Sequence, residues 1–253
     1  MSIWVLRGLR EGVVTTRWPR RPDEYADSWH GPATVRPDAD REPLPANLCP
    51  TNAIRISDGR VRVDQGKCIL CGRCVARRPR VFTWSAGATG PGAAALARQA
   101  LVVPEIAETD AAVAAVRASL AERTAALRRS VHVRHVDAGS DGSEEWEIQA
   151  LLGPVYDINR LGIFFTASPR HADVLLVTGA GTAGMTGPLR TTYDGMPDPR
   201  VVIAVGTDAV SGGLLRDQLT GMAGTVPVDI WVPGSPPPPF GILNALLIAV
   251  GKL

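Results

Sequence analysis

The four cysteines of the chain constrain its fold more than any other feature. Three of them follow one another at every third position, and the fourth stands upstream in front of a proline. They are Cys49, Cys68, Cys71 and Cys74. A C-x-x-C-x-x-C run holds three thiolates on one short loop, and a distant Cys-Pro supplies the fourth ligand of a cuboidal iron–sulfur cluster. The spacing therefore predicts one 4Fe–4S cluster on these four residues.

The bacterial ferredoxin pattern C-x2-C-x2-C-x3-C-P indicates why one cluster is expected and not two. In that pattern the fourth cysteine of each run ligates the cluster of the other run. The second run of this chain keeps three cysteines but has Arg78 in front of Pro79, and the first run keeps only Cys49 in front of Pro50. The remaining thiolates are enough for one cluster and leave none for another.

Two other uses of the cysteines stay open. A tetrahedral zinc site also takes four cysteines, but its usual form is two separate C-x-x-C knuckles, so the overlapping run suits zinc poorly. A disulfide framework is less favoured, because four cysteines are few for a chain of 253 residues. The iron–sulfur interpretation is preferred.

A β-hairpin is expected between Cys49 and the cysteine triplet. Residues 53–56 and 61–64 alternate between apolar and polar side chains around Asp58-Gly59. An Asp-Gly pair between two alternating runs is a strong signal for a two-residue hairpin turn.

Composition excludes some classes of protein. The net charge is only +2, which gives no reason to expect a nucleic-acid partner. Arg20-Arg21 is not followed by the apolar region of an export signal. The longest apolar run, 240–250, is too short for a membrane span and suits a buried helix. The chain is expected to fold in the cytoplasm, where thiolates stay reduced.

Four regions follow from the order of the patterns. Residues 1–47 are rich in Arg, Pro and Asp, include three tryptophans and show little periodicity, so they are expected to form an extended arm lying on another subunit. A ferredoxin-like module covers 48–84. A Gly- and Ala-rich linker and a long helix over 105–129 fill 85–129. The last region is 130–253.

The last region predicts an α/β domain with a parallel sheet. Apolar β-branched runs recur at 131–136, 162–167, 174–178, 201–205 and 228–232. Helical stretches are expected between or after them at 188–193, 213–222 and 241–250. Strands that alternate with helices are typical of βαβ units, whose parallel sheet is covered on both faces.

A glycine-rich turn follows the third of these strands. Gly179 to Gly184 fits G-x-G-x-x-G, so a dinucleotide site has to be considered. The fingerprint belongs in the first βαβ unit, however, and the acidic residue about 20 positions on, Asp198, lies between two prolines rather than at a strand end. A tight turn is the favoured interpretation.

The chain resembles two neighbouring subunits of one enzyme group. The entry segment from Leu6 to Pro19, with the cysteine module, resembles the two-cluster ferredoxin subunit of respiratory complex I and group 4 NiFe hydrogenases. Residues 129–250 are similar to their small subunit, the complex I 20 kDa type, which implies a flavodoxin-like fold. The motifs that carry the second likeness are His132 to Ser140, Pro154 to Asp157, Ser168 to Asp173, Val177 to Gly179, Met196 to Pro199, Ala204 to Gly206 and Val232 to Gly234. The likeness implies a fusion of the two subunits.

The departure from that small subunit is as informative as the likeness. Its loops after the strands supply four cysteines to a 4Fe–4S cluster. The corresponding positions in this chain are Asp141, Glu144, Asp208 and Ser235. Because oxygen ligands suit Mg²⁺ or Ca²⁺ rather than sulfide-bridged iron, this second cluster is expected to be lost. The vacated site is expected to be a hydrated pocket neutralised by nearby arginines, with a bound divalent cation as the alternative.

The resemblance implies an electron-transfer subunit with one 4Fe–4S cluster in a membrane-bound, complex I-like or hydrogenase-like oxidoreductase. Its expected partners are the large subunit and the membrane arm, at the cytoplasmic side of the membrane, and the chain has no spanning segment of its own. A structural scaffold subunit of a hydrogenase-related energy-converting complex is the alternative. A reductase that binds a nucleotide at Gly179 to Gly184 is a third possibility.

Overall fold

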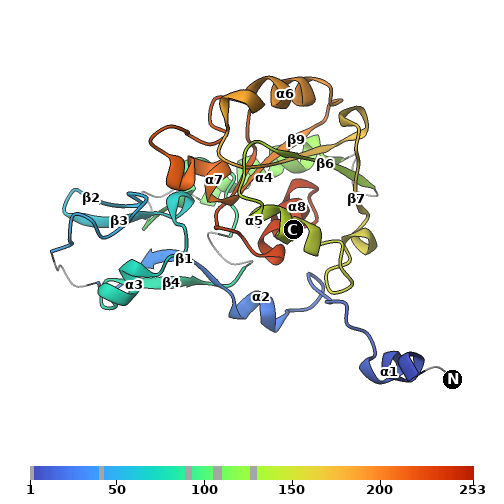
Figure 1. Cartoon of the computed structure of the whole chain (residues 1–253), viewed down its shortest axis with the longest axis horizontal. Coiled ribbons are helices and arrows are strands. Elements are labelled where there is room, and N and C mark those ends of the chain that lie inside the picture. The colour runs from blue at the N-terminus through green and yellow to red at the C-terminus, as the bar shows by residue number, and fades with distance from the viewer. Residues whose placement is uncertain (1–2, 40–42, 89–92, 105–109, 126–129) are drawn as a thin grey trace.

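The computed structural model describes residues 3–39, 43–88, 93–104, 110–125 and 130–253. In these ranges a cysteine-bearing module lies beside a larger α/β domain, and the N-terminal segment runs along both (Figure 1). The principal helices are α1 (Ile3–Glu11), α2 (Glu24–Ser28), α3 (Arg73–Arg77), α4 (Asp110–Arg123), α5 (Ser143–Ala150), α6 (Ala183–Asp194), α7 (Gly206–Ser211) and α8 (Pro239–Ala249). The strands are β1 (His30–Val35), β2 (Ile54–Ser57), β3 (Arg60–Asp64), β4 (Phe82–Ala86), β5 (Val102–Val103), β6 (Val131–Asp137), β7 (Ile163–Phe165), β8 (Val174–Thr178), β9 (Val201–Val205) and β10 (Ile230–Val232).

The α/β domain is built on a parallel sheet, as the sequence predicts. Its strand order is β10-β9-β8-β6-β7, and every neighbouring pair is parallel. The residues of β8 and β9 are all buried, which is why these strands read as continuous apolar runs rather than alternating ones. All five predicted strand positions in this region are confirmed.

Two hydrophobic layers cover the two faces of this sheet. Odd-numbered residues of β9, such as Val201 and Ile203, pack into one layer with α8 and with residues of α4 and α5. Even-numbered residues, such as Val202 and Ala204, pack into the other layer with Leu189 of α6. Since successive side chains of a strand point to opposite faces, the alternation assigns each helix to a face.

Three helices test the sequence predictions. Helix α8 is buried along its entire length, as expected for a helix that is apolar all round. The stretch predicted at 188–193 lies inside α6. The helix predicted at 213–222 is wrong: only the 3-10 turn η6 (Gly213–Leu215) forms there, because Gly212 and Gly213 take left-handed φ values of 81° and 54°.

The helix predicted over 105–129 is present as α4, at Asp110–Arg123. Leu120 is buried against α8, as an apolar stripe on this helix requires. Residues 105–109 and 126–129 lie outside the described residues. No helix in the described ranges is both long and apolar enough to cross a membrane.

The cysteine module contains two small antiparallel sheets. Strands β2 and β3 form the predicted hairpin, with Ser57 paired to Arg60. Both turn residues, Asp58 and Gly59, have positive φ, at 54° and 69°, as a two-residue hairpin turn of this hand requires. Strand β5 extends the hairpin, and β1 pairs with β4 in a separate sheet.

The N-terminal segment packs on its own chain beyond α1. The backbone N–H of Thr16 donates to the carbonyl of Val155, and the Trp18 ring lies edge-on to Phe240, with centroids 5.9 Å apart. Strand β1, which falls in the predicted arm, pairs with β4 of the cysteine module. Residues 30–35 therefore share a sheet with residues 82–86. The division into four regions that was drawn from the sequence stays a prediction.

Replacing Trp18 should show how much the N-terminal segment contributes to the stability of the fold. Trp18→Ala is expected to lower the free energy of unfolding by about 3–5 kcal/mol, because it empties a buried site against α8. Trp4→Ala is the matched control, since Trp4 on α1 is 74% exposed and Trp18 only 7%. Urea unfolding of both variants measures the difference. Equal effects of the two substitutions would show that the segment does not belong to the core.

Candidate functional site

The four cysteines line a single small cavity. Its walls also include Ala33 from β1, Thr51, and Trp84 from β4. Cys68 is buried, whereas Cys71 lies exposed at the surface. The folding of the hairpin between Cys49 and the triplet thus brings the sequence-predicted ligands to one place.

Backbone N–H groups point at two of the sulfur atoms, and one hydroxyl lies beside them. The N–H of Ala33 lies 3.5 Å from the Cys68 sulfur, and the N–H of Ala53 lies 3.3 Å from the Cys49 sulfur. The Thr51 hydroxyl is 3.4 Å from the same Cys49 sulfur. Hydrogen bonds to sulfur are among the features that tune the reduction potential of iron–sulfur clusters.

The loop that carries the triplet has an unusual backbone. Leu70 has a φ of 57° and Gly72 a φ of 70°, so two left-handed residues enclose Cys71. A Cβ atom on Gly72 would stand 3.2 Å from the Trp84 ring. The close approach of loop and indole explains why a glycine stands between Cys71 and Arg73.

Burial favours the protonated thiol at two of the four cysteines. Burial raises the pKa of Cys68, and it raises the pKa of Cys74 to about 11, with a further contribution from the neighbouring cysteines. A cation that binds the thiolates supplies the charge that stabilises their deprotonated form. The donor set fits an iron–sulfur cluster in residue type, number and surroundings. The atoms are not arranged in ion-binding geometry, however: within the described ranges no group of three or more His, Cys, Asp or Glu residues could hold a metal ion as it stands.

Thr207 ties the cysteine loop to the α/β domain. Its hydroxyl donates to the carbonyl of Cys68 at 2.9 Å, and its backbone N–H donates to the carbonyl of Gly234 at 2.6 Å. Thr207 lies in α7, which begins directly after β9, and Gly234 follows β10. The cysteines are thereby held at the carboxyl ends of two parallel strands.

An ion pair reinforces this junction. The Arg98 guanidinium makes a bidentate contact with Asp64 at 2.8 and 3.0 Å, and its Nε donates to the carbonyl of Val210 in α7. Asp64 ends β3, so one side chain joins the hairpin to the α/β domain. A Cβ atom on Gly66 would stand 2.7 Å from the Val210 side chain, which shows how closely the two parts pack.

Three acidic residues meet beside the same junction. Glu144, in the first turn of α5, is 1% exposed, and a Cβ atom on Gly206 would stand 2.3 Å from its carboxylate. Asp208 lies in the first turn of α7, and its charge and that of Asp141 both act on Glu144. The structure therefore brings together three of the four residues at the predicted vacated site. Ser235 lies in the loop after β10, one residue beyond Gly234.

The three carboxyl groups differ in acidity. Burial raises the pKa of Glu144 to about 7, and the charges of Asp208 and Asp141 add to the effect. Burial and Asp141 raise the pKa of Asp208, whereas hydrogen bonds from the hydroxyl and N–H of Ser143 lower the pKa of Asp141. Like charges in a buried site disfavour the ionised form.

In the described part of the chain, no arginine forms an ion pair with the carboxylates of this pocket. None of the ion pairs between described residues involves Asp141, Glu144 or Asp208. Apart from burial, the shift at Asp208 has Asp141 as its cause, with no cation among the contributors. The described ion pairs thus give no support to the neutralisation expected from the sequence, which stays a prediction, and burial favours the protonated form of Glu144.

The sequence did not predict a polar network that lies next to this pocket. Glu145 accepts hydrogen bonds from Ser140, at 2.7 Å, and from Thr178, and the His135 ring lies 3.0 Å from the Thr178 hydroxyl. Burial lowers the pKa of His135 despite the carboxylate of Glu145 nearby. His135 and Thr178 lie near the carboxyl ends of β6 and β8, and Glu145 lies in α5. The sequence signal that could have predicted this network is a histidine near a strand end followed by a glutamate in the next helix.

The glycine-rich segment is a tight turn that packs on the loop after β6. A Cβ atom on Gly179 would stand 2.6 Å from the backbone of Gly139 and Ser140, and its φ is 85°. Close backbone approach accounts for this glycine without a ligand.

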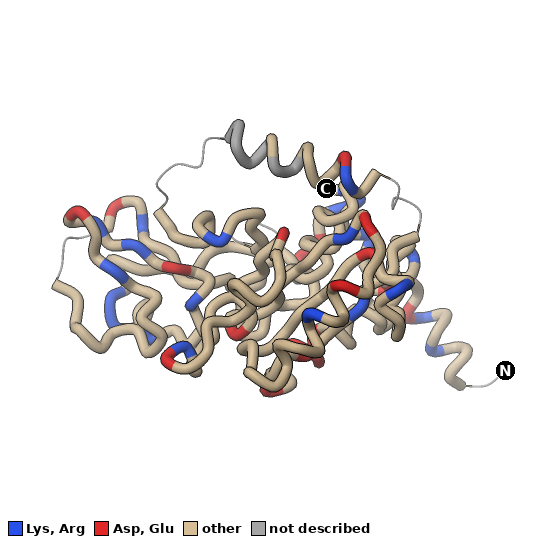
Figure 2. The backbone as a smooth tube through the Cα atoms, turned by 90° about the horizontal axis from the view of Figure 1, so that it is seen from above, with Lys and Arg blue, Asp and Glu red and all other residues tan. Residues whose placement is uncertain are grey.

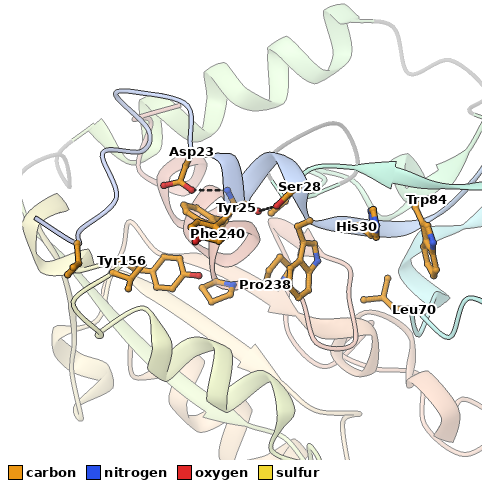
Figure 3. A pocket seen from close by; sticks show the side chains of 14 residues that line it. Asp23, Tyr25, Ser28, His30, Leu70, Trp84, Tyr156, Pro238 and Phe240 are labelled. Atoms are coloured by element: carbon orange, nitrogen blue, oxygen red, sulfur yellow. Dashed lines mark hydrogen bonds between the residues drawn. The ribbon is translucent and has the colours of Figure 1, made fainter. Parts of the chain in front are cut away.

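A large cavity lies on the other side of Trp84. Its volume is about 960 Å³, and aromatic side chains from separate segments surround it, as Figure 3 shows. The labelled rings include Tyr25, Trp84, Tyr156 and Phe240, and the Asp23 carboxylate accepts from the N–H of Tyr25. Trp84 also lines the cysteine cavity, so it forms a common wall between the two spaces.

Comparisons with known proteins show which family the α/β domain is similar to. The family model of the NADH ubiquinone oxidoreductase 20 kDa subunit matches residues 142–249. The formate hydrogenlyase subunit 7 of Escherichia coli is 39% identical over 159 residues, which are 62% of this chain and 61% of that protein. A probable membrane-bound hydrogenase subunit, mbhJ, of Pyrococcus furiosus is 40% identical over 130 residues, 50% of this chain and 78% of that protein.

A third relative comes from a quinone-reducing enzyme. An NADH-quinone oxidoreductase subunit of Desulfovibrio desulfuricans is 42% identical over 103 residues, which cover 40% of this chain and 56% of that protein. The chain thus spans less than two thirds of the formate hydrogenlyase and quinone oxidoreductase subunits, and more than two thirds of the hydrogenase subunit.

Glu144→Gln tests the protonation of the pocket. A folded-state pKa of about 7 lies above the unfolded value of 4.5, so wild-type stability should fall as pH rises from about 4.5 to 7 and level off above. Glu144→Gln should remove this fall and gain up to about 3 kcal/mol relative to wild type at pH 8. Urea titrations at several pH values measure the free energy of unfolding of wild type and variant. Glu24→Gln is the control, because Glu24 in α2 is exposed. If the difference in unfolding free energy between Glu144→Gln and wild type stays constant between pH 4 and 8, the raised pKa of Glu144 is refuted.

Proposed function

Since this chain belongs to the NADH ubiquinone oxidoreductase 20 kDa subunit family, we propose that it is an iron–sulfur electron-transfer subunit of a membrane-associated oxidoreductase. The enzyme is of the complex I or group 4 NiFe-hydrogenase type. Among the relatives are subunits named for formate hydrogenlyase, membrane-bound hydrogenase and NADH-quinone oxidoreductase, which supports this enzyme class.

The observation that carries the proposal is the cavity lined by all four cysteines of the chain. Cys49, Cys68, Cys71 and Cys74 would hold one 4Fe–4S cluster, which supplies one-electron transfer when bound. The chain contributes the thiolates and the backbone N–H groups of Ala33 and Ala53, which donate to the sulfur atoms of Cys68 and Cys49. It also fixes the loop through Thr207, whose hydroxyl donates to the carbonyl of Cys68.

The site at which the family's small subunit would hold its own cluster does not fit that group. Asp141, Glu144 and Asp208 offer hard oxygen atoms, one of them kept protonated near neutral pH by burial. We assign no electron-transfer step to this pocket. Electrons that reach the cysteine site must therefore leave by another route than the family's usual one.

The cysteine module and the α/β domain together represent a fusion in this proposal. Residues 48–84 correspond to the ferredoxin-like subunit and 130–253 to the small subunit, and the contacts of Arg98 and Thr207 give the two parts a fixed arrangement. The expected partners are the large subunit and the membrane arm, with the chain peripheral on the cytoplasmic side.

A scaffold function is the second candidate, and the carboxylate pocket favours it. Without cysteines at Asp141 and Asp208, the relay of the family ends before the large subunit. In that case the cysteine site organises the fold, and the α/β domain docks the neighbouring subunits.

Rapid-freeze electron paramagnetic resonance of the intact complex during turnover separates the two candidates. Electron transfer predicts that a 4Fe–4S signal appears and disappears with the substrate reaction, and that Cys49→Ala abolishes both the signal and the turnover. Ser235→Ala serves as the control and should leave both intact. A cluster that stays in one oxidation state throughout turnover would support the scaffold and contradict electron transfer.

A further inference from the structure

The cavity beside Trp84 lies where three separate parts of the chain meet. We name it the aromatic cavity; its volume is about 960 Å³. Its lining comes from the N-terminal segment, the cysteine module and the α/β domain, and the principal side chains are Asp23, Tyr25, Trp29, Trp84, Tyr156 and Phe240. Small-molecule sites have volumes of roughly 300–1,000 Å³ and are lined mainly by apolar and aromatic side chains with a few polar groups. The aromatic cavity matches that description in size and in composition.

Contacts between aromatic rings hold part of this lining in place. Tyr156 and Phe240 meet edge to face with their centroids 5.0 Å apart, and His30 stacks on Trp84 at 6.3 Å. Phe240 is 3% exposed, whereas Trp29 keeps 41% of its surface accessible. The face of an aromatic ring is electronegative and attracts a cation placed over it, most strongly for tryptophan. The cavity therefore brings together several rings that can bind a positively charged group.

The carboxylate of the lining belongs to Asp23. Its two oxygens accept hydrogen bonds from the backbone N–H of Tyr25 at 3.0 Å and from the Thr16 hydroxyl at 2.6 Å. These two bonds fix the position of the carboxylate. They do not use up its capacity, because an ionised carboxylate has about four lone-pair sites. A cation in the cavity can therefore interact with a fixed negative charge.

The electrostatics near Tyr156 have the same sign. Burial raises the pKa of Tyr156, and the negative charges of Glu147 and Asp23 raise it further. None of the described residues that line the cavity is a lysine or an arginine. Arg160 donates to the carbonyl of Tyr156 at 3.3 Å but is not part of the lining. Charged residues of both signs are spread over the rest of the described chain (Figure 2), so a preference for one sign has to come from the lining itself.

We propose that the aromatic cavity binds a small organic cation in which a quaternary or alkylated ammonium group is attached to an apolar body. The ammonium group lies among the rings near Asp23, and the apolar body extends toward Leu70 and Trp84, as Figure 3 allows the reader to follow. The proposal does not depend on the iron–sulfur function, because none of the four cysteines lines this cavity.

Other classes of ligand fit the lining less well. A ligand with a phosphate or carboxylate group is usually bound by arginine or lysine, and the described lining has neither. A purely apolar ligand would remove water from the Asp23 carboxylate without replacing its interactions, which costs free energy. A cation with an apolar body covers the rings and compensates the charge of the carboxylate at the same time.

The test uses the full chain and two probes of matched shape. Acetylcholine carries a trimethylammonium group, and 3,3-dimethylbutyl acetate has a carbon atom in place of the charged nitrogen. Benzoate serves as the anionic probe. Saturation-transfer difference NMR measures the dissociation constant of each probe. Acetylcholine should bind about tenfold more tightly than its uncharged isostere, as cation–π contacts in a partly dry site predict, and benzoate should bind more weakly than both.

Two variants separate the rings from the charge. Trp29→Ala should weaken the binding of acetylcholine about tenfold. Asp23→Asn should reduce the preference for acetylcholine over its isostere, while the fold is kept because asparagine also caps a helix N-terminus. Trp146→Ala is the matched control and should leave binding within about twofold of wild type, since Trp146 of α5 is 73% exposed and lies outside the lining.

Three results would overturn the proposal. Equal binding of acetylcholine and its isostere would make the cavity a general apolar site. Acetylcholine that binds no better than benzoate would remove the preference for positive charge. Binding of acetylcholine that both Trp29→Ala and Asp23→Asn leave unchanged would place the cation elsewhere on the chain. Circular dichroism of each variant shows that a loss of binding is not a loss of folding, and Asp23→Asn decides the question if Trp29→Ala does not fold.

Discussion

The hydrogen bonds of Thr207 are the interaction on which the arrangement of this chain depends. One side chain reaches the carbonyl of Cys68 while its backbone holds the loop after β10. The parallel sheet fixes where that loop lies, since the carboxyl ends of adjacent strands share one edge. The cysteine cavity is therefore attached to a rigid layer rather than to a linker, and the Arg98 ion pair closes the other side of the junction.

The same edge of the sheet carries the carboxylate pocket, and the two sites have opposite chemistry. Thiolates bind iron tightly and are stabilised by it, whereas buried carboxylates without a cation lower their charge by taking up protons. Glu144 does so near neutral pH. If this pocket is the vacated cluster site proposed above, the fold does not depend on that cluster, because α5 and α7 still begin at the positions where its ligands would stand.

The sequence predicted most of the sheet and the grouping of the cysteines. β-Branched runs determine buried parallel strands, and the Asp58-Gly59 turn determines the hairpin that brings Cys49 to the triplet. It did not predict α5, because acidic and polar residues fill the segment after Asp141 and no clear apolar stripe marks it. It also placed a helix at 213–222, where Leu214 and Leu215 are in fact exposed after two left-handed glycines. The electrostatics of the pocket depend on which side chains approach from other elements, and sequence distance does not reveal that.

Total iron and acid-labile sulfide per chain, determined on protein purified anaerobically, test the central claim most directly. The account predicts about four iron and about four sulfide atoms, as one 4Fe–4S cluster requires. About eight of each would place a second cluster on the oxygen ligands of Asp141, Glu144 and Asp208 and contradict the account. A single zinc ion in place of iron would contradict it as well.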